Sequence, residues 1–156
     1  MDFYKGKQMI KTKTAFVITV LILLFLKTTS SYATELKWEK TAQSAFYKAM
    51  SEKKKILLFV GRDDCGKCRY MLTQVFESEK PPVKSLLENN FVLWFSNADK
   101  STEWHRTALD LNEIPLPLIC IIDPDKSDKV YEDRTTGIQH SPEFYPRLLK
   151  HIKKGN

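Results

Sequence analysis

Two cysteines separated by two residues, Cys65 and Cys68, constrain this chain more than any other feature. They follow a run of five apolar residues, Ile56 to Val60, and precede an amphipathic run, Arg69 to Phe76. This pattern predicts a buried strand, a loop and a helix. Cys65 then falls at the helix N-cap, where free backbone N–H groups favour a thiolate, and Cys68 lies one turn later, within reach of a disulfide. The pair is therefore a candidate dithiol redox site.

Two other interpretations of the cysteine pair are weaker. A structural bridge within so short a loop closes little chain and adds little stability through loop entropy. A zinc site needs about four ligands, and the remaining candidates show no ligand spacing: Cys120, His105, His140 and His151. We therefore expect no metal. Cys120 lies among isoleucines in a predicted strand, which favours an inert core cysteine over a third redox partner.

The first 33 residues have the features of a secretory signal peptide. Basic residues between Lys5 and Lys13 precede twelve uncharged residues, Ala15 to Leu26, which are apolar except for one threonine. Ser31 and Ala33 place small side chains where a signal peptidase reads the chain. We expect a signal peptide at 1–33, cleaved after Ala33, and a mature domain at 34–156 that is exported, in a bacterium to the periplasm.

An uncleaved N-terminal membrane anchor is the alternative to cleavage. The uncharged run is shorter than the roughly 20 residues that span a bilayer, but Lys27 is an unusual flank for a cleaved signal.

The leader also holds most of the excess positive charge. The chain has 25 basic and 19 acidic residues, and 20 basic and 18 acidic residues remain from Thr34 onward. This near balance argues against a nucleic-acid-binding surface.

Hydrophobic periodicity predicts alternating strands and helices after the leader. We expect strands at 36–38, 56–60, 91–95, 118–122 and 129–132, and helices at 41–52, 65–77, 83–87, 101–111 and 141–152. Residues 134–137 are interpreted as a turn. Pro146 conflicts with a helix that begins at Ser141, so we expect a distorted first turn or a start nearer Pro146. The order predicts an α/β domain with a central, partly parallel sheet and helices on both faces.

This order, with Cys-Gly-Lys-Cys after the second strand and a proline before the strand at Leu118, resembles the thioredoxin superfamily. The chain is most similar to exported thioredoxin-like proteins related to the C-terminal domain of the membrane thiol-disulfide reductase. The matching features are Trp38, the helix at 42–50, Lys53–Lys55, the strand at 56–60, the segment 65–71, Val75-Phe76 and Phe91-Val92. The resemblance covers nearly all of residues 36–153. It implies a thioredoxin-like three-layer sandwich with a central mixed sheet.

The resemblance also implies roles for single residues. Cys65 is the attacking thiol and Cys68 the resolving one. A cis proline at the strand head lies against the disulfide, and the family register selects Pro117 over Pro115. A cis bond there turns the backbone of Leu116 outward, so that its N–H and C=O can pair with a substrate strand.

The chain departs from thioredoxin at two positions near the cysteines. Asp64 stands where thioredoxin has a tryptophan, and Phe59 stands where it has a buried aspartate. A carboxylate beside a thiolate raises the pKa of the thiol, whereas the nearby basic residues and the helix terminus lower it. Together with Gly66 and Lys67, which lie between the cysteines, Asp64 and the bulky apolar Leu116 are expected to position the substrate.

These observations favour an exported thiol–disulfide oxidoreductase whose direction, reducing or oxidising, the sequence does not set. Its only redox group would be the Cys65–Cys68 disulfide, with no further cofactor. The expected partners are proteins with thiols or disulfides and a membrane redox partner, and the protein is expected to be a monomer. Two other classes stay open: a non-catalytic module that binds client chains through Leu116 and Pro117, and a metallochaperone that holds Cu(I) between two thiolates.

Overall fold

The computed structural model describes residues 35–100, 107, 115–126 and 130–152. The chain divides into two compact units, Met1–Glu35 and Leu36–Asn156, and the description below concerns the second. The expected signal peptide lies outside the described residues, and so does the helix expected at 101–111 apart from Thr107. Within the described part of the chain, every helix is too short or too polar to cross a membrane.

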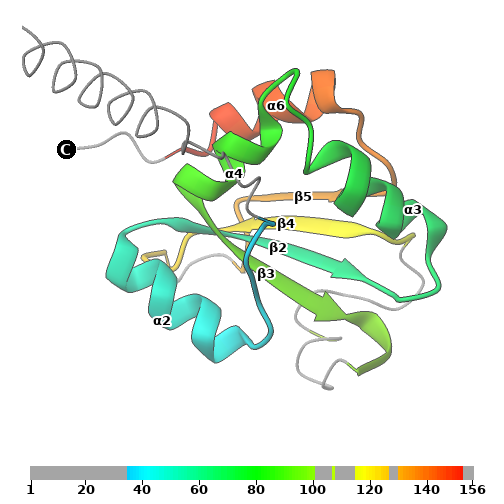
Figure 1. Cartoon of the computed structure of the whole chain (residues 1–156). Helices are drawn as coiled ribbons and strands as arrows, with labels where there is room; N and C mark the ends of the chain where they lie inside the picture. Colours follow the sequence, from blue (N-terminus) through cyan, green and yellow to red (C-terminus); the bar gives the residue numbers. More distant parts are fainter. Residues whose placement is uncertain (1–34, 101–106, 108–114, 127–129, 153–156) are drawn as a thin grey trace, which may run out of the picture. The chain divides into compact units, whose positions relative to one another are not determined.

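A five-stranded mixed sheet forms the centre of the domain (Figure 1). Its strands are β1 (Trp38–Glu39), β2 (Lys55–Gly61), β3 (Phe91–Asn97), β4 (Leu118–Ile122) and β5 (Asp133–Thr136). They lie in the order β1-β3-β2-β4-β5. β1 and β2 run parallel to β3, β4 runs antiparallel to β2, and β5 runs antiparallel to β4. The predicted mixed sheet is therefore confirmed.

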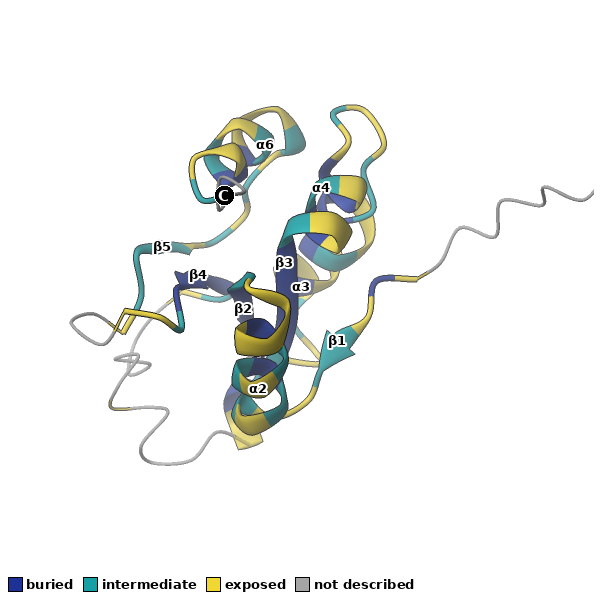
Figure 2. Ribbon diagram, turned by 90° about the vertical axis from the view of Figure 1, so that its left-hand side faces the viewer, coloured by how far each residue is buried: buried dark blue, intermediate teal, exposed yellow. Residues whose placement is uncertain are grey.

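Helices cover both faces of this sheet, as Figures 1 and 2 show. Helix α2 (Ala42–Glu52) lies on one face, and α3 (Gly66–Tyr70), α4 (Val83–Asn90) and α6 (Ser141–Leu149) lie on the other. The α2-side core contains Ala45, Ala49, Ile56, Leu58, Val60, Val92, Trp94, Ala98, Leu118, Cys120 and Ile122. The three-helix core contains Leu36, Leu57, Phe59, Cys68, Met71, Val75, Phe76, Val83, Leu87, Phe91, Leu93, Ile119, Ile121, Phe144 and Leu148.

These two cores explain why the apolar run of β2 does not alternate with polar residues. Successive strand residues point to opposite faces, so Leu57 and Phe59 enter the three-helix core while Ile56, Leu58 and Val60 enter the α2-side core. All five side chains are fully buried. A strand covered on both faces has to be apolar at every position.

Helix α2 begins and ends close to where the sequence predicted. The Thr41 hydroxyl accepts a hydrogen bond from the Ser44 N–H at 3.1 Å, which satisfies one of the free donors of the first turn. Lys53 adopts a left-handed conformation with φ of 54°, and the Lys54 N–H donates to the Ala49 carbonyl at 2.9 Å. The turn after Lys53 leads directly into β2.

The helix that follows Cys65 changes its winding. Residues Gly66–Tyr70 form α3, and Met71–Val75 form a π-helical segment in which the Phe76 N–H donates to the Met71 carbonyl at 2.9 Å. The sequence predicted a single helix to residue 77. Met71 and Val75 are both buried in the three-helix core, which places the wider turn inside the packed layer.

The antiparallel partner of β4 lies four residues later than predicted. It is Asp133–Thr136 rather than 129–132, so the interpretation of 134–137 as a turn was wrong. The prediction followed the apolar pair Val130 and Tyr131, but Val130 is 49% exposed. The polar strand at the edge of the sheet is held by side-chain contacts, since Asp133 binds Arg147 and the Arg134 guanidinium lies 5.7 Å from the Tyr131 ring centre.

Helix α6 starts at Ser141, so a start nearer Pro146 was also wrong. Pro142 occupies the first turn, where its missing N–H costs no hydrogen bond. The His140 N–H donates to the Glu143 carboxylate at 3.2 Å, which ties the turn before the helix to its first residues. Pro146 is tolerated inside the helix, whose buried residues Phe144 and Leu148 pack into the three-helix core.

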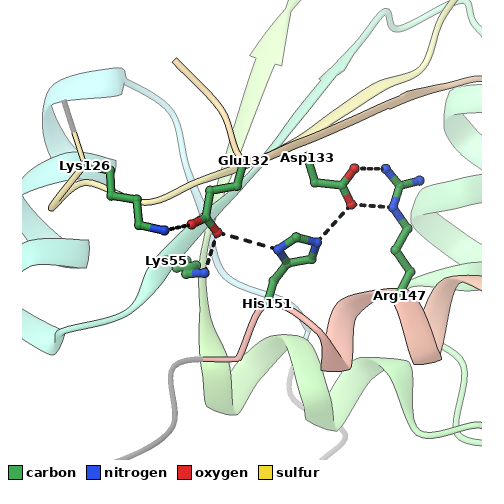
Figure 3. Close-up of polar contacts among 6 residues, drawn as sticks. All are labelled: Lys55, Lys126, Glu132, Asp133, Arg147 and His151. Carbon is green, nitrogen blue, oxygen red and sulfur yellow. Dashed lines mark hydrogen bonds and ion pairs between the residues drawn. The ribbon is translucent and has the colours of Figure 1, made fainter. Parts of the chain in front are cut away.

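A network of charged side chains joins α6 to the sheet (Figure 3). It consists of Lys55, Lys126, Glu132, Asp133, Arg147 and His151. His151 lies between the two carboxylates, with Nε2 3.0 Å from Asp133 and Nδ1 3.6 Å from Glu132. Lys55 begins β2 and the cysteines follow the end of β2, so the network lies at the opposite end of this strand from the candidate site.

The network sets the protonation of both carboxylates. Burial by itself raises the pKa of Glu132, but hydrogen bonds from Lys126 and Lys55 outweigh it and hold that pKa at about 2. Hydrogen bonds from Arg147 hold the pKa of Asp133 below its ordinary value against the opposing effect of burial. Both groups are therefore ionised at neutral pH, and they fix β5 to the last helix.

Candidate active site

The two cysteines of the motif form a disulfide with unequal exposure. Cys65 caps α3 as predicted, and Cys68 lies one turn later with its Cα 5.2 Å from that of Cys65. The Cys68 N–H donates to the Cys65 sulfur at 3.1 Å. Cys65 is half-buried, whereas Cys68 is 1% exposed. Cys65 is therefore the more accessible cysteine of the pair.

The Cys68 side chain lies in an apolar environment. It belongs to the three-helix core, together with Phe59 and Met71. Phe59 stacks on Phe95 at 5.9 Å between ring centres and meets Phe76 edge-on at 5.4 Å. Of the described residues, only Lys84, Ser96 and Asp123 are buried polar or charged ones. The Cys68 side chain itself packs among apolar residues.

The proline loop enters the sheet beside the cysteines. The Leu116–Pro117 peptide bond is cis, as the family register predicted for Pro117. Val60, the residue before Gly61, pairs with Leu118, the residue after Pro117. Gly61 in turn lies against Cys68. The sheet thus brings the proline loop and the cysteine pair to the same end of the domain.

The loop after β5 holds the proline loop from its other side. The Gly137 N–H donates to the Pro117 carbonyl at 2.8 Å, and Gly137 has a φ of 78° that favours glycine. The Gln139 N–H donates to the sulfur of Met71 at 3.3 Å, which links the same loop to the cysteine helix. These contacts escaped the sequence interpretation because residues 134–137 were assigned to an isolated turn.

The other predicted positioning residues face solvent. Asp64, Gly66 and Lys67 are exposed, and Leu116 is half-buried against both cores. The loop before Cys65 is tied to β3 and the turn after it. Arg62 pairs with Asp99 at 3.0 Å, and the Asn97 amide lies 3.4 Å from the Asp63 carboxylate. Lys67 and Asp64 are therefore open to a partner.

Cys120 lies apart from the pair. It belongs to the α2-side core, on the opposite face of the sheet from Cys68, and it is a free, fully buried thiol. Burial raises the pKa of the Cys120 thiol to about 12. The predicted core position of Cys120 is confirmed. Within the described ranges, no three His, Cys, Asp or Glu side chains gather so that they could hold a metal ion.

A Cys-x-x-Cys disulfide at the start of a helix, beside a cis proline at the head of a strand in a mixed sheet, defines a thioredoxin-fold protein. The sequence model of the Thioredoxin-like family matches residues 37–124, which is more than half of the chain. The chain therefore belongs to the Thioredoxin-like family. No curated protein sequence matches it.

Solved structures show the same fold. A thioredoxin from Thermus thermophilus has a TM-score of 0.61 and 23% identity, with 75% of this chain and 87% of that one covered. The DsbD C-terminal domain of Neisseria meningitidis in its oxidised form has a TM-score of 0.56 and 15% identity, covering 74% and 99%. The DsbH oxidoreductase has a TM-score of 0.55 and 19% identity, covering 80% and 91%. The fold and the Cys-x-x-Cys disulfide suggest a thiol–disulfide oxidoreductase.

Proposed function

We propose that this protein is an exported thiol–disulfide oxidoreductase that exchanges disulfides with other proteins through Cys65 and Cys68. The observation that carries the proposal is the asymmetry of the pair. The Cys65 sulfur is half-buried and accepts a hydrogen bond from the Cys68 N–H, while the Cys68 sulfur is enclosed by the core. An accessible thiol next to a shielded one favours attack by the first and release by the second.

The reaction of the reduced protein proceeds in two exchanges. The Cys65 thiolate attacks one sulfur of a substrate disulfide, forms a mixed disulfide and releases the first substrate thiolate. Cys68 then loses its proton and attacks the Cys65 sulfur, which forms the Cys65–Cys68 disulfide and releases the second substrate thiolate. The substrate gains two electrons, and its two thiolates take up protons from water or the released Cys68 proton. The reverse sequence oxidises a substrate dithiol.

The surface beside Cys65 supports a protein partner with an apolar segment. Leu116 is half-buried beside the proline loop, and Ile138, which follows Gly137, is 41% exposed. Asp64 and Lys67 add charges of both signs on the solvent side. An extended partner chain could pair with the backbone at Leu116 while its side chains meet this apolar rim. A membrane redox partner would restore the starting state of the pair, and the leader would deliver the domain to it.

Trapping of mixed disulfides tests this proposal. A Cys68→Ser variant lacks the resolving thiol, so it should accumulate mixed disulfides through Cys65 when the variant is expressed in exporting cells. Non-reducing gels and mass spectrometry would detect these adducts. Cys120→Ser is the matched control, because Cys120 is buried on the other face, and it should behave like the wild type. Adducts formed through Cys120, or the absence of adducts through Cys65 in the Cys68→Ser variant, would contradict the proposal.

Cys68→Ser together with a further variant, Cys65→Ser, separates the two alternative functions. A client-binding module would hold its partners non-covalently even after Cys65→Ser. A metallochaperone would bind Cu(I) in the wild type and lose it after Cys68→Ser, without mixed disulfides.

The direction of exchange follows from the reduction potential of the pair, because a value of about −270 mV fits a reductant and one of about −120 mV fits an oxidant.

A further inference from the structure

Gly61 is the last residue of β2 and an unusual residue for its place. It is buried in the central strand and pairs with Asn97 of β3. Glycine weakens a strand interior because it packs no side chain and loses more backbone freedom on folding. Its backbone does not require glycine, since Gly137 is the one glycine with a positive φ in the described part of the chain. The reason for Gly61 must therefore lie in the space around it.

A side chain at position 61 would press on the cysteine pair. A Cβ atom there would lie 3.3 Å from both the Cβ and the sulfur of Cys68, and 2.8 Å from Cε1 of Phe59. All three distances are shorter than ordinary carbon contacts. Gly66, the glycine between the two cysteines, is different, because a Cβ atom there would meet nothing within 4 Å. The lack of space therefore requires glycine at position 61, outside the motif, but not at position 66.

We propose that Gly61 is a positioning residue of the redox pair, and that its missing side chain sets the balance between the disulfide and the dithiol. In the disulfide, the Cys68 sulfur is bonded to Cys65 and cannot turn away from position 61. In the dithiol that bond is absent, so a rotation about the Cys68 Cα–Cβ bond within the core can carry the sulfur away from position 61. A methyl group at position 61 therefore destabilises the disulfide more than the dithiol. This inference rests on the proposed redox function.

Equilibration with glutathione measures this balance directly. Two glutathione molecules reduce one Cys65–Cys68 disulfide, lose two electrons and two protons, and form one glutathione disulfide, while the protein gains both as two thiols. We expect Gly61→Ala to shift this equilibrium about tenfold toward the dithiol, which corresponds to a reduction potential about 30 mV more positive. Leu58→Val is the control, because it disturbs the packing of the same strand on the opposite face of the sheet from Cys68, and it should leave the potential close to that of the wild type.

The contact with Phe59 requires a second variant, because Gly61→Ala also presses on that buried ring. Phe59→Leu shortens the side chain and removes the ring atom in question. If Gly61 acts on Cys68, the double variant Gly61→Ala/Phe59→Leu should have a more positive potential than Phe59→Leu alone, by about the same amount. If the contact with the Phe59 ring prevents Gly61→Ala from folding, the double variant should still fold, and its potential can be measured. Thermal unfolding of each variant records the effect on packing separately.

Two results would overturn the inference while leaving the proposed function intact. One is a Gly61→Ala potential equal to that of Leu58→Val. The other is a shift that disappears in the Phe59→Leu background, which would show that Gly61 only makes room for the ring. A wild-type pair that does not exchange with glutathione at all would overturn the proposed function itself, and the role of Gly61 with it.

Discussion

At the scale of single residues, the three cysteines differ in exposure rather than in chemistry. Cys65 is half-buried at a helix start, Cys68 is enclosed by the three-helix core, and Cys120 is enclosed by the α2-side core. The spacing of the first two predicted a pair, and the apolar neighbours of the third predicted a core position. In the proposed reaction, the attacking and resolving roles follow from which of the two cysteines the folded chain leaves accessible.

Alkylation of the reduced, folded protein should follow this order of exposure. We expect iodoacetamide at pH 8 to modify Cys65 first, Cys68 more slowly and Cys120 only after unfolding. Cys120 is buried and its pKa is about 12, so its reactive thiolate is scarce at pH 8. Peptide mass spectrometry at successive times would give the three rates, with the denatured protein as the control in which all three react. Modification of Cys120 as fast as Cys65 would contradict the assigned burial.

At the scale of elements, β5 and α6 depend on each other. β5 is a polar edge strand, and α6 contains an internal proline, so neither is strongly favoured by its own sequence. The charged network between them supplies what local propensity lacks. Asp133 accepts hydrogen bonds from Arg147 Nε at 2.6 Å and from its terminal nitrogen, and the same carboxylate contacts His151.

Removal of Arg147 should destabilise the domain more than removal of an outer ion pair. We expect Arg147→Gln to lower the free energy of unfolding by about 1–3 kcal/mol, because it removes charged hydrogen bonds to the partly buried Asp133. Lys48→Gln removes the more exposed pair with Glu39, whose Nζ–Oε1 distance is 3.0 Å, and should cost less than about 1 kcal/mol. Urea unfolding at neutral pH would compare the two variants. Equal losses would argue against a special role for the network.

The same network predicts the response of the domain to acid. The pKa of Glu132 is about 2 in the folded protein and about 4.5 as its ordinary value, so its ionisation stabilises the fold above the ordinary value. This contribution is lost as the pH falls from about 5 toward 2. We expect Glu132→Gln to be less stable than the wild type at pH 7 and nearly equal to it at pH 2. Urea unfolding across this pH range would test the convergence, and a constant difference would contradict it.

At the scale of the whole molecule, the domain is a sheet with two separate cores, one on each face. The described members of both cores all come from Leu36 onward. The cysteine pair and the proline loop lie at one end of β2, and the charged network lies at the other. Changes in the network should therefore alter stability without altering the redox chemistry.

A shortened chain tests whether the domain stands by itself. We expect residues 34–156, produced without the leader, to fold cooperatively and to reduce small disulfides or oxidise small dithiols at the same rate as the full chain, since both cores and the cysteines are retained. Circular dichroism and a disulfide-exchange assay would measure this. Failure of the shortened chain to fold would show that the first 33 residues contribute to the domain.

The order of most elements and the place of the cysteine pair could be predicted from local patterns of residues. Apolar runs and capping residues act over a few neighbours, so β2, β3, β4, α2 and the N-cap position of Cys65 could be predicted locally. The assignment of Pro117 as the cis proline came from the family register, and the Leu116–Pro117 bond agrees.

Three features depend on contacts that only the tertiary structure makes: the position of β5, the closeness of Gly61 to Cys68, and the unequal exposure of the two motif cysteines. β5 is polar and forms where Asp133 meets Arg147, so a search for apolar residues placed it four residues too early. The closeness of Gly61 to Cys68 arises because the cysteine helix folds back over the end of its own strand. The two residues of the motif carry the same side chain, and packing over the sheet is what leaves Cys65 partly exposed and encloses Cys68.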